Sequence, residues 1–291
     1  MIPAIVLTAG LGTRLRPLSD HLAKPAMPVA GPTLVERILG QLRAAGVRDA
    51  VLNLHHLGHT ITAVVGDGSH LGLRVRYSWE REILGSGGGP ARAFRLLGDE
   101  RAFILNGDTL TDLDLAALAR SHAATGALVT LAVVPNTTPQ KYGGVVADAT
   151  GTFTGIVPRG SATPSWHFVG VQVADRAAYA GVSPDQPSDS IAGAYAALAA
   201  ARPGSVRVAP VETTFSDIGT PEDYRATCLA LARREGVQPY GAGLSIGAGA
   251  VVEDSVLWDG VAVGPGARVT GCVLTSGTEV PAGAVWTNLI R

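Results

Sequence analysis

Glycines and basic residues gather close to the start of the chain, directly after an apolar run. Residues 2–7 predict a short buried strand, and Gly10 and Gly12 follow it. Because glycine has no side chain, backbone N–H groups in such a turn can approach a phosphate closely. Arg14 and Lys24 add positive charge just beyond the turn. These residue types predict a binding site for a polyanion such as a nucleoside triphosphate.

Two common glycine motifs do not fit this turn. The dinucleotide fingerprint requires a third glycine three residues after the second, and that position here is Leu15. The P-loop requires Gly-Lys followed by Ser or Thr, which the turn lacks. An ordinary strand-to-loop turn with solvated arginines, including Arg16, remains the alternative that the residues alone leave open.

Two aspartates stand where they could hold a metal ion. Asp108 follows a predicted strand at 103–106, and a carboxylate at a strand end can hold Mg²⁺ against phosphate oxygens. Asp217 lies far along the chain, at a second predicted strand end, and two such carboxylates can share one ion. The alternative is that Asp108 forms a turn and Asp217 makes loop hydrogen bonds.

The elements that position these residues alternate between strands and helices. The spacing predicts strands at 51–54, 73–77 and 103–106, and helices at 33–45, 58–65 and 91–97. From residue 128 it predicts strands at 128–134, 144–147, 153–157 and 168–173, then helices at 190–201 and 220–234. This order predicts an α/β fold, a Rossmann-like mixed, mainly parallel sheet flanked by helices. Ligands of such sheets bind at the carboxyl ends of strands, where both the glycine turn and Asp108 fall.

A repeat of 17 residues occupies the C-terminal part of the chain. Gly247-Ala248-Gly249-Ala250 recurs as Gly264-Pro265-Gly266-Ala267 and as Pro281-Ala282-Gly283-Ala284. One apolar residue followed by small ones predicts a β-helix with one coil per repeat. We therefore expect a first domain at 1–234, a linker at 235–243 and a β-helix at 244–291. Trp286, Leu289 and Ile290 would offer an apolar end for homo-oligomer formation.

The overall composition is that of an ordinary globular protein. The 291 residues are 46% hydrophobic, and 23 basic and 24 acidic residues give a net charge of −1, which predicts neither nucleic-acid nor membrane binding. No apolar run reaches the length of a membrane span. A predicted strand directly after Met1 leaves no room for a signal peptide. Cys228 and Cys272 are isolated in the sequence, and we expect both to be reduced thiols. These features predict a cytoplasmic location.

The residues Ala9–Leu15, taken together with Lys24–Val29, resemble the signature of the sugar-1-phosphate nucleotidylyltransferases. The resemblance extends to about Leu231, and the repeat resembles the left-handed β-helix that follows the catalytic domain in many members. It implies an enzyme that transfers a nucleotidyl group from a nucleoside triphosphate to a sugar 1-phosphate, releasing pyrophosphate. Asp108 and Asp217 would hold Mg²⁺ or another divalent cation, Lys24 would contact the triphosphate, and Arg14 would contact the leaving pyrophosphate.

The same resemblance implies a nucleotide site that includes the segment Leu84–Gly89. Glu80 stands where the family reads the base, although Glu82 competes for that position. An ionised carboxylate only accepts hydrogen bonds, and guanine offers two adjacent donors where uracil and thymine offer one, which favours GTP. The implied nucleotide-binding residues are Leu7, Ala9, Gly10, Gly12, Thr13, Arg14, Lys24, Glu80, Gly85, Gly87 and Gly88.

The site for the sugar phosphate departs from the family pattern. The usual Glu-Lys-Pro is replaced by Pro158-Arg159-Gly160, so Arg159 would take the role of the phosphate-binding lysine. The implied residues are Asn106, Tyr142, Gly143, Gly144, Arg159 and Gly170. GTP with mannose 1-phosphate, or a related manno- or heptose 1-phosphate, is the expected substrate pair. The alternatives are UTP or dTTP with glucose 1-phosphate or an N-acetylated sugar 1-phosphate, and a non-catalytic subunit that binds nucleotide sugars.

Overall fold

The computed structural model describes residues 2–291, which form two compact units that interleave along the chain. The first unit contains the chain up to Gly10, Ile38–Gly58 and Val65–Phe215. The second unit contains Leu11–Arg37, His59–Val64 and Ser216–Arg291. No helix within residues 2–291 has both the length and the apolar character needed to cross a membrane.

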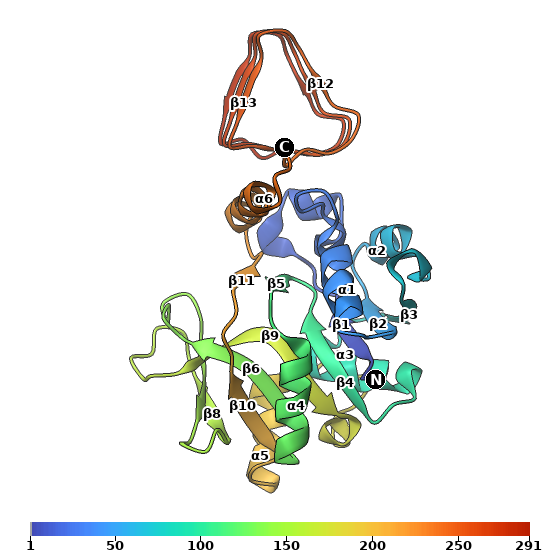
Figure 1. The fold of residues 1–291 in the computed structure, drawn as a ribbon, viewed down its shortest axis with the longest axis vertical. Coiled ribbons are helices and arrows are strands. Elements are labelled where there is room, and N and C mark those ends of the chain that lie inside the picture. Colours follow the sequence, from blue (N-terminus) through green and yellow to red (C-terminus); the bar gives the residue numbers. More distant parts are fainter. Residues whose placement is uncertain (1) are drawn as a thin grey trace. The chain divides into compact units, whose positions relative to one another are not determined.

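The first unit is built on a nine-stranded mixed sheet (Figure 1). Its main strand order is β10-β6-β9-β4-β1-β2-β3, with β7 and β8 attached through β9. The pairs of β1 with β2 and β4, of β2 with β3 and of β6 with β10 are parallel, whereas β9 runs antiparallel to β4 and β6. The predicted mixed, mainly parallel sheet is thereby confirmed. The strands are β1 (Ala4–Leu7), β2 (Asp49–Leu54), β3 (Arg74–Trp79), β4 (Arg101–Asn106), β6 (Val129–Pro135), β7 (Gly144–Ala147), β8 (Phe153–Val157), β9 (Trp166–Asp175) and β10 (Val206–Pro210).

Helices cover both faces of this sheet. Side chains alternate between the two faces of a strand, and in β6 Val129 and Leu131 belong to the same core as Phe94 of α3. Between them, Thr130 is hydrogen-bonded through Oγ1 to Nδ1 of His122 in α4 at 2.8 Å. Figure 1 shows α4 in front of β6 and α5 behind the sheet. The helices of the chain are α1 (Leu34–Ala44), α2 (Gly58–Val65), α3 (Gly85–Leu97), α4 (Leu115–Thr125), α5 (Ala196–Ala201) and α6 (Pro221–Glu235).

Three helical segments differ from the expectations, and the strand β10 was not predicted at all. Helix α4 was not predicted, although its Asp114 side chain accepts a hydrogen bond from Ala117 N at the helix start. Helix α3 begins at Gly85 rather than at 91, so Pro90 lies inside the helix instead of opening it. The segment predicted as one helix at 190–201 forms a π-helical turn at Ser190–Tyr195 before α5. Because glycine has a low intrinsic helix propensity, the sequence pattern does not indicate that α3 begins in this glycine-rich segment.

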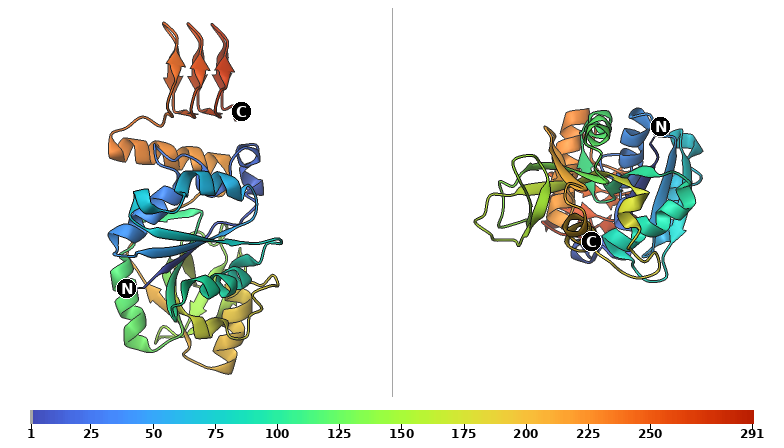
Figure 2. Two further views of the ribbon diagram at one scale, coloured as in Figure 1. Left: turned by 90° about the vertical axis from the view of Figure 1, so that its right-hand side faces the viewer. Right: turned by 90° about the horizontal axis from the view of Figure 1, so that it is seen from below.

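The C-terminal repeat folds as parallel coils with a period of 17 residues. Equivalent residues of successive coils pair directly, as Val252 pairs with Val269 and Val269 with Trp286. Figure 2 shows these coils stacked in register. The predicted β-helix is thereby confirmed. Its strands are β12 (Ser245–Ile246), β13 (Val251–Glu253), β14 (Val256–Leu257), β15 (Ala262–Val263), β16 (Arg268–Thr270), β17 (Val273–Leu274), β18 (Glu279–Val280) and β19 (Val285–Thr287).

Within the second unit, α6 joins the N-terminal loop segment to the β-helix. The Tyr224 hydroxyl donates to the carbonyl oxygen of Pro28 at 2.5 Å. Nε1 of Trp258, in the β-helix, donates to the same hydroxyl oxygen at 2.8 Å. Tyr224 and Trp258 are both fully buried. One tyrosine of α6 therefore bridges the segment that follows Lys24 and the first coil.

Candidate active site

The point where the sheet reverses its order lies between β1 and β4. Leu7 and Asn106, the last residues of these parallel strands, are register partners. Gly107 N donates to the carbonyl oxygen of Leu7 at 2.9 Å. A Cβ atom on Gly107 would lie 2.5 Å from that oxygen and 2.8 Å from Cγ2 of Thr8, so only glycine fits there. The chain segments that lead to Gly10 and to Asp108 therefore leave the sheet side by side, at the edge where α/β proteins bind ligands.

Asp112 has a structural role that the sequence did not reveal. Its Oδ1 accepts hydrogen bonds from Oγ1 of Thr213 and from N of Thr214, and its Oδ2 accepts from Oγ1 of Thr214, each at 2.7 Å. These hydrogen bonds, first those from the side chains of Thr213 and Thr214, lower the pKa of Asp112 to about 2. Asp112 follows β5 (Thr109–Thr111) and fixes the chain just before β11 (Phe215–Asp217). Asp108, four residues earlier, is half-buried, and its Oδ1 accepts from Oγ1 of Thr109 at 3.3 Å.

In the loop after the glycine turn, one side chain is buried and several others are exposed to solvent. Leu15 is buried, whereas Thr13 and Arg14 are exposed and Leu11 is 45% exposed. Gly12 adopts a left-handed conformation at φ 63°, and its carbonyl oxygen accepts a hydrogen bond from Oγ of Ser19 at 2.8 Å. A loop held in this way presents its backbone and Arg14 to solvent, as binding of a soluble polyanion requires.

Arg14 lies beside the segment that carries Asp217, within the second unit. A Cβ atom on Gly219 would lie 3.4 Å from Nη1 of Arg14 and 3.3 Å from Oδ2 of Asp223. Thr220 and Asp223 form a capping box that starts α6, with Asp223 N donating to Oγ1 of Thr220 at 3.2 Å and Thr220 N to Oδ2 of Asp223 at 3.1 Å. This cap holds the residues after Asp217 in place next to Arg14.

Lys24 is the least exposed of the predicted cationic residues, with 9% of its surface accessible. The Cβ atom of Lys24 lies 3.7 Å from the position of a Cβ on Gly12, so the base of the Lys24 side chain lies next to the glycine loop. A lysine this deep in a protein requires an anionic or polar partner. The second unit thus brings Gly12, Lys24, Arg14 and the Asp217 segment into one neighbourhood, whereas Asp108 belongs to the first unit.

Glu80 is buried and belongs to a hydrogen-bond network that links the ends of β1, β2 and β3 to the start of α3. The carboxylate is 4% exposed; Oε1 accepts from Nδ2 of Asn53 and Oε2 from N of Leu84, each at 2.8 Å. Oδ1 of Asn53 accepts from N of Thr8 at 2.6 Å. This hydrogen-bond network therefore fixes the start of α3 relative to the glycine turn. Base reading by Glu80 stays a prediction, and Glu82 is exposed.

The hydrogen-bond network around Glu80 gives a prediction for the stability of the protein. Asn53→Leu removes the amide and leaves Glu80 Oε1 and Thr8 N without their partners in a buried site. We expect the free energy of unfolding to fall by about 3 kcal/mol, measured by urea denaturation. Gln140→Ala, at an exposed position, serves as the control and should stay within about 0.5 kcal/mol of the wild type. A loss below about 1 kcal/mol for Asn53→Leu would contradict the stabilising role of the network.

The glycines at the start of α3 pack against another part of the first unit. A Cβ on Gly85 would lie 2.6 Å from the carbonyl oxygen of Ser188, and one on Gly88 2.5 Å from that of Gln186. Gly87 N donates to the carbonyl oxygen of Ser188 at 2.9 Å. This packing by itself requires small residues at these positions. Contact of Gly85, Gly87 and Gly88 with a nucleotide stays a prediction.

The residues predicted for the sugar phosphate form two groups. Gly144 pairs with Val157 at the end of β8, and a Cβ on Gly143 would lie 3.6 Å from the backbone N of Arg159. Tyr142–Gly144 and Arg159 are therefore neighbours. In the second group, a Cβ on Gly170, at φ 77°, would lie 3.2 Å from Cβ of Asn106.

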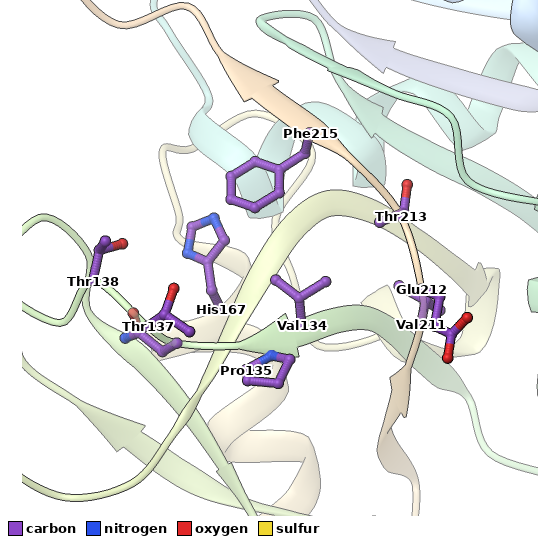
Figure 3. Close-up of a pocket in the computed structure, with 10 residues that line it drawn as sticks. Val134, Pro135, Thr137, Thr138, His167, Val211, Glu212, Thr213 and Phe215 are labelled. Carbon is purple, nitrogen blue, oxygen red and sulfur yellow. The ribbon is translucent and has the colours of Figure 1, made fainter.

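An aromatic cluster beside the first group was not predicted, apart from Tyr142. The His167 ring lies 4.2 Å from the Tyr142 ring and 4.8 Å from the Phe215 ring, measured between centroids, and Figure 3 shows the latter pair. Burial lowers the pKa of His167, and the charge of Lys141 lowers it further, so this imidazole is neutral at pH 7. The cluster joins Tyr142 to the first residue of β11.

With these positions established, comparison with known proteins assigns the class. The chain belongs to the family described as nucleotidyl transferase, whose model matches residues 3–234. It is 39% identical over 147 residues to mannose-1-phosphate guanylyltransferase of Mycobacterium tuberculosis, covering 50% of this chain and 41% of that protein. It is 43% identical over 115 residues to N-acetylmuramate alpha-1-phosphate uridylyltransferase of Neisseria meningitidis, covering 39% of this chain and 50% of that protein.

A third relative and a solved structure complete the comparison. D-glycero-alpha-D-manno-heptose 1-phosphate guanylyltransferase of Aneurinibacillus thermoaerophilus is 35% identical over 143 residues, covering 49% of this chain and 62% of that protein. The chain thus spans between about two fifths and three fifths of the length of these relatives. The crystal structure of HddC from Yersinia pseudotuberculosis shares the fold, with a TM-score of 0.68, 23% identity and coverage of 79% of this chain and all of that one.

Proposed function

We propose that this protein transfers a nucleotidyl group from a nucleoside triphosphate to a sugar 1-phosphate, forming a nucleoside diphosphate sugar and pyrophosphate. One observation carries the proposal. The pairing of Leu7 with Asn106 brings the segments that lead to the glycine turn and to Asp108 out of the sheet together at its switch point. The family match and the activities named for the relatives support it.

The chain's own residues act by positioning and by neutralising charge. An oxygen of the sugar phosphate attacks the α-phosphorus in line, and the bond between that phosphorus and the pyrophosphate oxygen breaks. Lys24 holds the triphosphate, and the positive charge of Arg14 stabilises the negative charge that develops on the leaving pyrophosphate. The backbone from Leu7 to Thr13, with Ala9, Gly10 and Gly12, cradles the phosphates. Asn106, Tyr142, Gly143, Gly144, Arg159 and Gly170 bind the sugar phosphate, and no protein nucleophile is required.

Asp108 and Asp217 suit a magnesium ion in the proposed site. Among residues 2–291 no group of three His, Cys, Asp or Glu side chains forms a complete metal site. Mg²⁺ is commonly held by one or two carboxylates together with substrate phosphates and water, so two aspartates suffice. When bound, the ion neutralises charge on the phosphate oxygens.

GTP and mannose 1-phosphate are the proposed substrates. Two of the relatives described above are named as guanylyltransferases that act on mannose 1-phosphate or a manno-heptose 1-phosphate. The second candidate is UTP with an N-acetylated sugar 1-phosphate. The identity of 43% to the N-acetylmuramate alpha-1-phosphate uridylyltransferase favours that candidate.

Pyrophosphate release from each of four nucleoside triphosphates, across a panel of sugar 1-phosphates and with MgCl₂, tests the proposal. The panel contains mannose, manno-heptose, glucose, N-acetylglucosamine and N-acetylmuramic acid 1-phosphates. We expect the highest kcat/KM for GTP with mannose 1-phosphate. Preference for UTP with an N-acetylated sugar would establish the second candidate instead. Nucleotide-sugar binding without turnover of any pair would contradict an enzymatic role and favour a regulatory subunit.

A further inference from the structure

The short segment that carries Lys24 is held by backbone hydrogen bonds before and after the lysine. Ala23 N donates to Oγ1 of Thr60 in α2 at 3.1 Å. Lys24 opens a 3₁₀ turn, in which its carbonyl oxygen accepts a hydrogen bond from Met27 N at 3.2 Å. The carbonyl oxygen of Met27 in turn accepts from N of Leu34, the first residue of α1, at 3.0 Å. The position of Lys24 is therefore linked to the position of the chain that follows the turn.

Side chains of α6 and α1 hold the residues directly after this turn. The Tyr224 hydroxyl of α6 donates to the carbonyl oxygen of Pro28 at 2.5 Å. Sγ of Cys228, one helical turn further along α6, lies 3.8 Å from the same oxygen. Val29 is fully buried, and its carbonyl oxygen accepts from Nε of Arg37 in α1 at 2.7 Å. The loop after Lys24 therefore depends on tertiary hydrogen bonds for its position.

Trp258 of the β-helix determines the direction of the hydrogen bond from Tyr224 to Pro28. An indole N–H group can only donate, and a proline carbonyl group can only accept. Nε1 of Trp258 donates to the hydroxyl oxygen of Tyr224 at 2.8 Å, which leaves the hydroxyl proton for Pro28. Burial raises the pKa of Tyr224 well above its ordinary value, so the hydroxyl keeps this proton. Successive hydrogen bonds of this kind polarise and strengthen one another.

The position of Trp258 depends in turn on the stacking of the coils. Leu257 pairs with Leu274 of the next coil, and Trp258 N donates to the carbonyl oxygen of Leu274 at 2.8 Å. The Trp258 side chain is buried, and its ring lies edge-on to the Tyr224 ring, with 6.4 Å between the centroids. A continuous path of hydrogen bonds therefore leads from the stacked coils of the β-helix to Pro28.

We propose that Tyr224 is a positioning residue for nucleotidyl transfer, and that Tyr224 and Trp258 together hold Lys24 in the place where it binds the triphosphate. The β-helix thereby contributes to nucleotide binding without touching the substrate. The inference rests on the proposed transferase function, in which Lys24 holds the triphosphate. Small displacements of a group that orients a reacting phosphate have large effects on the rate, even when their cause lies outside the site.

A double-mutant cycle of Tyr224→Phe with Lys24→Gln tests the inference, using the best substrate pair of the wild type. Phenylalanine keeps the buried ring and removes the hydroxyl. We expect Tyr224→Phe to lower kcat/KM for the nucleoside triphosphate about tenfold, the effect of one lost hydrogen bond. The KM for the sugar 1-phosphate should change less than about twofold. In the Lys24→Gln background, Tyr224→Phe should lower kcat/KM less than about twofold, because the group that Tyr224 positions is absent.

Tyr179→Phe is the matched control for the loss of a buried hydroxyl. Tyr179 is buried in the core of the first unit, where its hydroxyl is hydrogen-bonded to that of Tyr195. The substitution should lower the midpoint of thermal unfolding, as Tyr224→Phe does, and leave kcat/KM unchanged.

Trp258→Phe provides a milder second variant, because it removes the N–H donor and leaves the Tyr224 hydroxyl in place. We expect it to lower kcat/KM for the nucleoside triphosphate about threefold. The same cycle with Lys24→Gln decides the question if Tyr224→Phe does not fold.

The outcomes separate this inference from the function on which it rests. An active wild type in which the losses caused by Tyr224→Phe and Lys24→Gln multiply would overturn the inference and leave the transferase function intact. A Tyr224→Phe protein with wild-type kcat/KM, or with the KM values of both substrates raised equally, would overturn it too. Absence of turnover by the wild type with every substrate pair would remove the proposed function itself.

Discussion

Asp108→Asn is expected to lower kcat by about 10³-fold with GTP, mannose 1-phosphate and saturating MgCl₂. The substitution keeps the shape of the side chain and removes one negative charge. Asp108 is half-buried at the carboxyl edge of the sheet, so the loss of charge falls where the proposed site holds its metal ion. Pyrophosphate release measures the effect, and the midpoint of thermal unfolding shows that the variant remains folded.

Asp114→Asn is the matched control for this experiment. Asp114 caps α4 through its hydrogen bond from Ala117 N, and asparagine caps a helix about as well as aspartate. Its side chain is 64% exposed and belongs to no part of the proposed site. We expect activity equal to that of the wild type. An Asp108→Asn protein that retains more than about a tenth of wild-type kcat would contradict metal binding by this residue.

Lys24→Gln is expected to reduce kcat/KM for the nucleoside triphosphate by about 10²-fold. Lys24 is 9% exposed beneath Gly12, so its charge acts in a poorly solvated environment where electrostatic interactions are strong. The KM for the sugar 1-phosphate should change little, because that substrate does not contact Lys24 in the proposed arrangement. Steady-state kinetics with each substrate varied in turn separate the two effects.

Lys24→Arg and Arg16→Gln complete this comparison. Arginine keeps the charge but not the compact ammonium group, so Lys24→Arg should recover part of the activity. Arg16 is 64% exposed and pairs with Asp20 at 3.1 Å, and its replacement should leave kcat/KM unchanged. A Lys24→Gln protein that is impaired only toward the sugar 1-phosphate would show that Lys24 does not bind the triphosphate.

The parts of the fold that carry strong local patterns could be predicted from the sequence. The strand at the start of the chain, the glycine turn and the 17-residue repeat each depend on residues close together in the chain. Helix α4 was missed because the alanine-rich segment Leu115–Thr125 has little contrast between its apolar and polar faces. The start of α3 was missed because its glycines, poor helix formers, are required by packing against Gln186 and Ser188, about 100 residues away.

The site was predictable only where residue types carry the chemistry by themselves. Asp112 could not be assigned, since the threonines that bind it are 101 and 102 residues away. The contacts of His167 with Tyr142 and Phe215 depend equally on long-range packing. The interleaving of Leu11–Arg37 with Ser216–Arg291 in one unit has no local signal either. Local sequence patterns identify candidate site residues, and only the tertiary contacts show which of these residues have structural roles.

The most direct test of the metal site is a crystal structure of the protein with Mn²⁺ and a non-hydrolysable GTP analogue. Anomalous scattering from manganese locates the ion without reference to any assumed role. We expect one anomalous peak, shared by carboxylate oxygens of Asp108 and Asp217, with the triphosphate lying along Gly10–Arg14. A manganese ion bound away from either aspartate, or a triphosphate bound elsewhere in the molecule, would contradict the account.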